Sequence, residues 1–238
     1  MRTPDISILR PGDPFKVALL LFPNLTQLDL TAPHEVFKRV RGVEAVTVWK
    51  NLQPVKSVTG LALVPDQTMA ECQSADLLCV PGGPGHLEMM QDQETLAWIR
   101  NIAAGARLVT SVCTGALVLG AAGLLRGYRA TTHWSSLDAL PLLGAIPVRE
   151  RVVWDRNRVT GGGVTAGIDF GLQIIARLWG DDVAEMSQLT LEYDPAPPFN
   201  CGSPRSARPE LLARAETVMR GYRAKVMATA SAAAARFD

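Results

Sequence analysis

Short apolar runs alternate with segments of helical periodicity along most of the chain. Runs such as KVALLLF at 16–22 and ADLLCV at 75–80 have the length of strands buried on both faces. A β-like run at 55–64 is interrupted by Gly60, which predicts a hairpin or an excursion at the sheet edge. The pattern predicts strands at 16–22, 44–50, 75–80, 107–112, 128–132 and 148–154, and helices at 29–41, 93–104, 116–125, 166–179 and 182–193.

Alternation of buried strands with helices predicts an α/β fold with a parallel sheet covered by helices on both faces. In such folds the ligand crevice lies at the carboxyl ends of the strands. Three features follow strands at this edge: Asp29 after the first, Gly82-Gly83 after a later one, and Cys113 after another. We therefore expect these residues to meet although they are far apart in sequence. In the helix at 29–41 we expect Thr31 as the cap and Pro33 near the start.

Cys113 carries the strongest chemical signal in the sequence. A strand leads into it, a helix follows it, and Gly115 comes two positions later, which is typical of a nucleophile elbow. A thiol at a helix start lies near unpaired N–H groups and the positive end of the helix dipole. This position predicts a lowered thiol pKa and a nucleophilic role. The alternative is a small buried residue that only begins a helix.

The other candidates have structural alternatives of equal or greater weight. Gly82 and Gly83 form either a pair of donors for a developing anion or a tight turn between strand and helix. Asp29 is either a carboxylate that reaches the thiol or a turn residue. His133 is either a base for Cys113 or a structural histidine. The run GGG at 161–163 is explained by turn geometry.

Composition narrows the partners and cofactors. Lys plus Arg number 24 and Asp plus Glu 23, so the net charge is +1, which favours neither nucleic acid nor an anionic membrane. The four cysteines, with only three histidines, show no metal-binding spacing, so we expect no metal. The first fourteen residues hold no apolar run long enough for a signal peptide core, and no stretch of the chain has the length of a membrane span. The chain is expected to be cytoplasmic, with its cysteines as thiols.

Three segments are predicted. Residues 1–14 form a flexible N-terminal tail, residues 15–204 form the domain, and residues 205–238 form an amphipathic helix. The last segment holds seven basic and three acidic residues, a net charge of +4. We expect it to pack on its own domain or on a partner subunit; a nucleic-acid or membrane arm is the less favoured alternative. Its apolar stripe is expected to comprise Leu211, Ala215, Val218, Tyr222 and Val226.

Several motifs together resemble the bacterial isocyanide hydratases. They are LFP at 21–23, QLDLTAP at 27–33, PGG at 81–83, SVCTG at 111–115, ATTHW at 130–134, GGG at 161–163 with TAGID at 165–169, and PAPPFN at 195–200. The resemblance covers about residues 16–204. It implies a flavodoxin-like parallel sheet sandwiched by helices, of the class I glutamine-amidotransferase-like type. That superfamily also includes the Parkinson-disease-associated protein, intracellular cysteine peptidases and the amino-terminal domains of arabinose-regulator-type transcription factors.

The resemblance implies addition of water to an isocyanide to give an N-substituted formamide, a hydro-lyase reaction. Cys113 would attack the isocyanide carbon and form a thioimidate, Asp29 would transfer protons, and Thr114 would orient the thiol or Asp29. Gly82 and Gly83 would stabilise negative charge in the substrate-binding site. The resemblance also implies a homodimer, a small apolar substrate and no cofactor.

Departures from related branches sharpen this expectation. Peptidase members usually carry His after the nucleophile, where this chain has Thr114, and many superfamily members have Glu where this chain has Asp29. The regulator branch shares the CTG and TTHW motifs, but after residue 204 this sequence holds one helical segment rather than a DNA-binding module. The alternatives are a non-catalytic ligand-binding or regulatory domain and a glyoxalase- or deglycase-like enzyme.

Overall fold

A seven-stranded sheet forms the centre of the molecule. The computed structural model describes residues 8–237. The strand order is β10-β11-β7-β6-β1-β2-β5. All neighbours pair in parallel except β10 and β11, which are antiparallel. The bounds are β1 Phe15–Leu20, β2 Val43–Trp49, β5 Gln67–Thr68, β6 Leu77–Val80, β7 Leu108–Val112, β10 Val152–Asp155 and β11 Arg158–Gly161.

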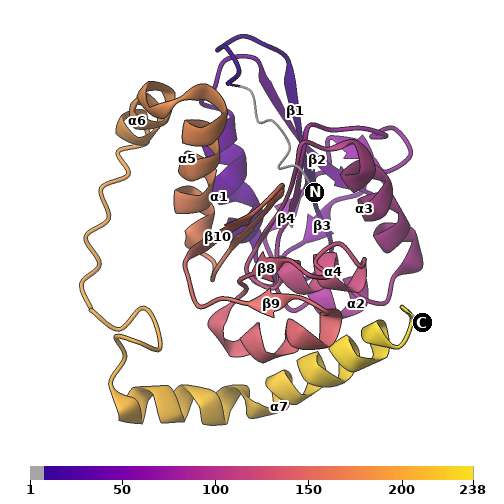
Figure 1. The fold of residues 1–238 in the computed structure, drawn as a ribbon, viewed down its shortest axis with the longest axis vertical. Helices are drawn as coiled ribbons and strands as arrows, with labels where there is room; N and C mark the ends of the chain where they lie inside the picture. Colours follow the sequence, from indigo (N-terminus) through magenta and orange to yellow (C-terminus); the bar gives the residue numbers. More distant parts are fainter. Residues whose placement is uncertain (1–7, 238) are drawn as a thin grey trace.

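Helices cover both faces of this sheet (Figure 1). Helices α1 and α5 pack against each other on one face, and α3 and α4 lie on the other. The bounds are α1 Gln27–Phe37, α2 His86–Met89, α3 Gln93–Gly105, α4 Gly115–Ala121, α5 Ala166–Trp179, α6 Asp181–Thr190 and α7 Pro209–Ala234, with 3-10 helices η1 Trp134–Ala139 and η2 Pro141–Leu143. This arrangement buries every residue of β6 and β7, as their continuous apolar sequences require.

The topology confirms the predicted fold. The order β2-β1-β6-β7-β11 is the flavodoxin-like order, in which the chain builds outward from β1 in one direction and then in the other. The direction reverses between β1 and β6, so the carboxyl ends of β1, β6 and β7 lie side by side. The segments that carry Asp29, Gly82 and Cys113 follow these three strands.

Two smaller strand pairs flank the main sheet. The predicted hairpin at 55–64 is confirmed as the antiparallel pair β3 (Val55–Lys56) and β4 (Ala62–Leu63). The strand predicted at 128–132 is β8 (Arg129–Ala130), which pairs with β9 (Ile146–Pro147) outside the main sheet.

Several local boundaries differ from the prediction, most clearly that of α1, and one strand, β11, was not predicted. Helix α1 begins at Gln27 with Thr26 as its cap, so Thr31 lies inside the helix and donates to Gln27 Oε1 (2.9 Å). Pro33 is accordingly an interior residue of this helix. Strand β11 was not predicted because its sequence, RVTG, has no apolar run; Arg158 is buried there because its guanidinium donates to the Leu124 carbonyl (2.8 Å).

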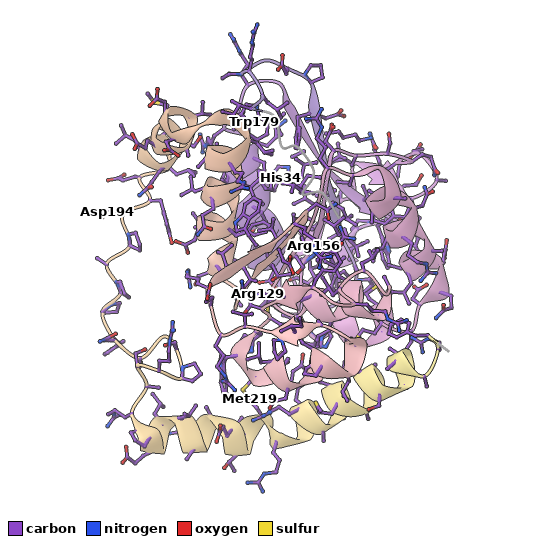
Figure 2. All side chains as sticks on the ribbon, in the orientation of Figure 1. His34, Arg129, Arg156, Trp179, Asp194 and Met219 are labelled. Atoms are coloured by element: carbon purple, nitrogen blue, oxygen red, sulfur yellow. The ribbon has the colours of Figure 1, made fainter. Side chains whose placement is uncertain are left out.

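The C-terminal segment forms one helix, α7, at the lower edge of the molecule, reached through an irregular arm over residues 191–208 (Figure 1). Asp194 lies on this arm, away from the sheet (Figure 2). The predicted apolar stripe is only partly correct. Val226 is 1% exposed and Tyr222 is half-buried, whereas Val218 is 78% exposed, because only the second half of α7 packs on the domain, against η1, η2 and α4.

The predicted N-terminal tail is described from residue 8 onward, and residues 1–7 lie outside the described residues. The Leu9 amide donates to the Leu178 carbonyl (2.6 Å) and the Gly12 amide to the Arg41 carbonyl (2.8 Å). Within residues 8–237, none of the helices combines the length and the apolar character needed to cross a bilayer.

Candidate active site

Cys113 occupies the sharp turn between β7 and α4. Its φ is +55°, in the left-handed region that non-glycine residues rarely adopt. Neighbouring backbone holds this conformation: the Cys113 amide donates to the carbonyls of Gly161 (3.1 Å) and Gly162 (2.8 Å). The Thr132 hydroxyl donates to the Cys113 carbonyl (2.8 Å). The thiol therefore sits on a strained but well-supported turn, as the elbow pattern predicts.

Asp29 lies in the first turn of α1 and is completely buried. Its Oδ2 accepts a hydrogen bond from the Gly82 amide (3.0 Å). Its Oδ1 is buried and has no fixed partner among the described residues. One carboxylate oxygen is thus held in place, and the other is available for proton exchange.

The glycine turn after β6 supports the two flanking side chains. Besides the contact of Gly82 with Asp29, the Gly83 amide donates to Thr114 Oγ1 (3.0 Å). A Cβ at Gly82 would lie 2.6 Å from Thr114 Oγ1 and 2.9 Å from Asp29 Oδ2, so no larger residue fits. The structure thus brings Asp29, Gly82, Gly83, Cys113 and Thr114 together. Both glycine amides are already engaged, however, so they orient these side chains instead of forming the free donor pair expected from the sequence.

The electrostatic surroundings of Cys113 differ from the expectation. Burial and the negative charge of Asp29 raise the pKa of the Cys113 thiol, while the amides of Thr114 and Val164, which donate to the sulfur, lower it. The expected lowering by the helix is outweighed because the thiol is only 5% exposed and α4 is short, Gly115–Ala121. Without a bound ligand the thiol therefore keeps its proton.

Burial also acts on Asp29. It raises the pKa of this carboxyl from 3.8 to about 7, whereas the hydrogen bond from the Gly82 amide and the neighbouring Cys113 thiol lower it. A carboxyl with this pKa is able to take and return protons near neutral pH. Because Asp29 and Cys113 interact directly, they titrate as a coupled pair.

A cavity of about 380 Å³ lies next to the elbow, although Cys113 itself is not among its lining residues. Three lining residues touch Cys113: Gly162 accepts from its amide, Thr132 donates to its carbonyl, and the Val164 amide faces its sulfur. His133 also lines this cavity, and its Nδ1 is bound to Ser135 Oγ (2.8 Å). No hydrogen bond within the described residues joins His133 to Cys113, which favours the structural alternative for this histidine.

The remaining cysteines lie outside this arrangement. All four thiols are free. Cys79 is fully buried in β6, and burial raises its pKa to about 12, so it is inert. Cys72 is buried and Cys201 is exposed. Within residues 8–237 no group of three or more His, Cys, Asp or Glu side chains is arranged to hold a metal ion.

Three residues near the site were not selected from the sequence. Val164 follows the glycine run 161–163, and its amide faces the Cys113 sulfur. His86 follows the turn at 81–85, is completely buried, and its Nδ1 lies 2.8 Å from the Gly83 carbonyl. Tyr222 comes from α7 and contacts His86. The glycine runs are a signal for the first two, whereas nothing local marks Tyr222.

Gly115 is required for the close approach of α4 to β6. A Cβ at this position would lie 2.0 Å from the Val80 carbonyl oxygen and 2.7 Å from that of Pro81. We expect Gly115→Ala to destabilise the fold by about 1–3 kcal/mol and to reduce activity, because the elbow must shift. Gly105→Ala at the end of α3 is the matched control: a Cβ there meets nothing within 4 Å, so stability should be unchanged or higher. Urea unfolding measures both, and equal stability of the two variants would contradict this packing argument.

Comparison with known proteins identifies the family of this chain. Residues 15–177 match the DJ-1/PfpI family. The chain is 57% identical over 192 residues to the isonitrile hydratase of Pseudomonas putida, covering 81% of this chain and 84% of that protein. A THiJ/PfpI family protein from Pseudomonas syringae has a similar structure, with a TM-score of 0.91 and 45% identity over 95% of each chain. The HTH-type transcriptional regulator GbdR of Pseudomonas aeruginosa is 29% identical over 72% of this chain but only 49% of its own length. The chain belongs to the DJ-1/PfpI family.

Proposed function

We propose that this protein is an isocyanide hydratase, which adds water to R–NC and releases an N-substituted formamide. The observation that carries the proposal is the hydrogen-bonded cluster in which Gly82 holds Asp29 and Gly83 holds Thr114 beside the Cys113 thiol. The similarity to the isonitrile hydratase of Pseudomonas putida supports the choice of substrate. An isocyanide carbon needs both a nucleophile and a proton, which a thiol and a carboxylate supply together.

In the first step the Cys113 sulfur bonds to the isocyanide carbon. Asp29 takes the thiol proton as the S–C bond forms and then delivers this proton to the same carbon. The product is a thioimidate, Cys113–S–CH=N–R, with Asp29 as a carboxylate. A thiol that keeps its proton until substrate arrives fits this order, because its raised pKa prevents a free thiolate in the resting site.

In the second step water attacks the thioimidate carbon. Asp29 removes one proton from this water as the O–C bond forms, and the electron pair of the C=N bond moves to nitrogen, which then takes that proton. The C–S bond breaks next, its electron pair returns to sulfur, and the hydroxyl proton restores the Asp29–Cys113 pair. Formamide leaves, and water has supplied both protons that the cycle needs.

Thr114 and the two glycines serve this chemistry by positioning. The Thr114 amide donates to the sulfur and its hydroxyl accepts from Gly83, so the residue fixes the elbow relative to the glycine turn. Gly82 fixes the carboxylate through Oδ2 and leaves Oδ1 for the proton. We propose that the substrate group R occupies the adjoining cavity of about 380 Å³.

The test is an ultraviolet assay of formamide formation from an aryl isocyanide, with methylglyoxal assayed in parallel. Saturable formamide formation by the purified protein is expected. Turnover of methylglyoxal alone would favour a glyoxalase-like enzyme. Turnover of neither substrate would favour the alternative of a non-catalytic ligand-binding or regulatory domain.

The dependence of kcat/KM on pH should reflect the protonation of the Asp29 carboxyl. Below about pH 7 this carboxyl is protonated and unable to take the thiol proton, so kcat/KM is expected to fall about tenfold per pH unit on the acid side. Measurement of kcat/KM from pH 5 to 9 with a non-titrating isocyanide gives this limb. A flat profile, or a limb centred near the ordinary aspartate pKa, would contradict the role given to burial.

We also propose that the protein is a cytoplasmic homodimer. Four free cysteines suit a reducing compartment. Large apolar side chains are exposed on α6, the arm and the first half of α7: Met186, Leu189, Phe199 and Val218 are 61%, 74%, 75% and 78% exposed. A second subunit that covers these side chains would explain the exposure. Light scattering should give twice the chain mass of 25.6 kDa.

A further inference from the structure

The C-terminal helix brings a side chain to the catalytic cluster. The second half of α7 is fixed on the domain by buried Val226, Ala230 and Ala233. Next to Tyr222, Arg223 forms an ion pair with Asp138 (2.9 Å). These anchors hold the Tyr222 ring edge-to-face against His86, with the ring centres 6.1 Å apart. Tyr222 is therefore held firmly against His86.

A chain of contacts joins Tyr222 to the glycine turn. Its hydroxyl lies 3.4 Å from His86 Nδ1, which lies 2.8 Å from the Gly83 carbonyl. Because a carbonyl only accepts, His86 Nδ1 carries the proton and donates it to Gly83. The protonated Nδ1 has no lone pair that could accept a hydrogen bond from Tyr222. The hydroxyl proton of Tyr222 is therefore free to be donated to another acceptor. His86 is the single hydrogen-bond partner of this hydroxyl within residues 8–237.

Tyr222 lies beside the glycine turn and stays protonated. Burial, and after it the charge of a Cys113 thiolate, raise the pKa of Tyr222 to about 12. Through His86 the hydroxyl is placed beside the turn whose amides hold Asp29 and Thr114, and within residues 8–237 it is not hydrogen bonded to Cys113. A donor with this pKa keeps its proton and offers only a hydrogen bond.

In the second step of the proposed reaction, the residues described so far offer no hydrogen-bond donor to the substrate nitrogen. When water adds to the thioimidate, the nitrogen gains an electron pair. The amides of Thr114 and Val164 face the sulfur. The amides of Gly82 and Gly83 already donate to the side chains of Asp29 and Thr114. We propose that Tyr222, supplied by α7, donates a hydrogen bond to the substrate nitrogen while water adds. This inference rests on the proposed thioimidate. The proton that ends on nitrogen still comes from water through Asp29, and Tyr222 keeps its own.

The test compares Tyr222→Phe with Tyr128→Phe. Both changes remove one hydroxyl from a half-buried tyrosine, but Tyr128 packs between Arg156 and Arg158, away from the site. Tyr222→Phe is expected to lower kcat about 10- to 100-fold, the effect of losing a hydrogen bond to a developing charge, with a smaller change in KM. Intact mass measured on quenched steady-state mixtures should show the Cys113 adduct accumulating above the wild-type level, because its breakdown is slowed. Tyr128→Phe should behave like wild type.

Each outcome decides a separate point. Unchanged kcat in Tyr222→Phe overturns the role of the hydroxyl. A lower kcat without extra adduct overturns the assigned step and indicates a role before the adduct or in positioning. Absence of adduct from wild type and both variants, with turnover intact, rejects the proposed thioimidate instead. Equal melting temperatures for the three proteins are expected, and a large drop for Tyr222→Phe alone would indicate a structural role.

Discussion

Replacing Cys113 with alanine is expected to lower formamide formation by at least about 10 000-fold. The substitution removes the atom that bonds to the isocyanide carbon and leaves no second nucleophile nearby. Cys79 lies buried in β6 with its pKa raised to about 12, and no described hydrogen bond joins His133 to the elbow. The ultraviolet assay under saturating isocyanide measures the loss.

Two further variants separate chemistry from folding. Cys201→Ala removes an exposed thiol and should retain wild-type activity. Cys113→Gly also removes the nucleophile, but glycine adopts the φ of +55° without strain, so this variant should be at least as stable as wild type and inactive. Wild-type rates from either Cys113 variant would reject the nucleophile assignment.

Replacing Asp29 with asparagine is expected to reduce kcat/KM about 100- to 1000-fold. Asparagine is close in size and its amide oxygen accepts from Gly82, so the geometry is retained. It is unable to take the thiol proton or to activate water, and both steps should slow. The acid limb near pH 7 should disappear from the residual activity. A residual profile with the same limb would show that another group titrates there.

The same substitution should stabilise the fold at alkaline pH. The Asp29 pKa is raised above its unfolded value of 3.8 to about 7, so the native state binds the extra proton, and wild-type stability falls as pH rises between these values. Asparagine lacks this penalty, so the advantage of Asp29→Asn should grow from about pH 4 to 7 and reach at most about 4 kcal/mol. Urea unfolding at pH 5 and 8 measures the difference. A destabilised variant at pH 8 would contradict the energetic cost of a buried Asp29 carboxylate.

The sequence predicted the features that depend on strand ends. Runs such as 75–80 and 107–112 are apolar because both faces of β6 and β7 are covered, and the loops at the carboxyl ends of such strands must lie at one edge of the sheet. The meeting of Asp29, Gly82 and Cys113 was therefore predictable without any distance between them. The short strand β11 was not predicted because it contains the charged Arg158. This side chain is buried only because its guanidinium donates to the Leu124 carbonyl, a contact that exists only in the folded chain.

Other features depend on contacts that leave no local trace. The direction of the Cys113 pKa is set by burial and by Asp29, which outweigh the short helix that the sequence suggested. The engaged amides of Gly82 and Gly83 become visible only when Asp29 and Thr114 are placed. Tyr222 reaches the site because α7 folds back onto η1 and η2, while Val218 one turn earlier stays exposed.

The central claim is a covalent bond between Cys113 and the isocyanide carbon. Intact mass and peptide mapping of wild-type protein, quenched during turnover of a slow isocyanide, test it most directly. The account predicts an increase by the mass of one substrate molecule, located on Cys113 and absent from Cys113→Ala. Continued formamide formation with no adduct on Cys113, or an adduct on another residue, would contradict it.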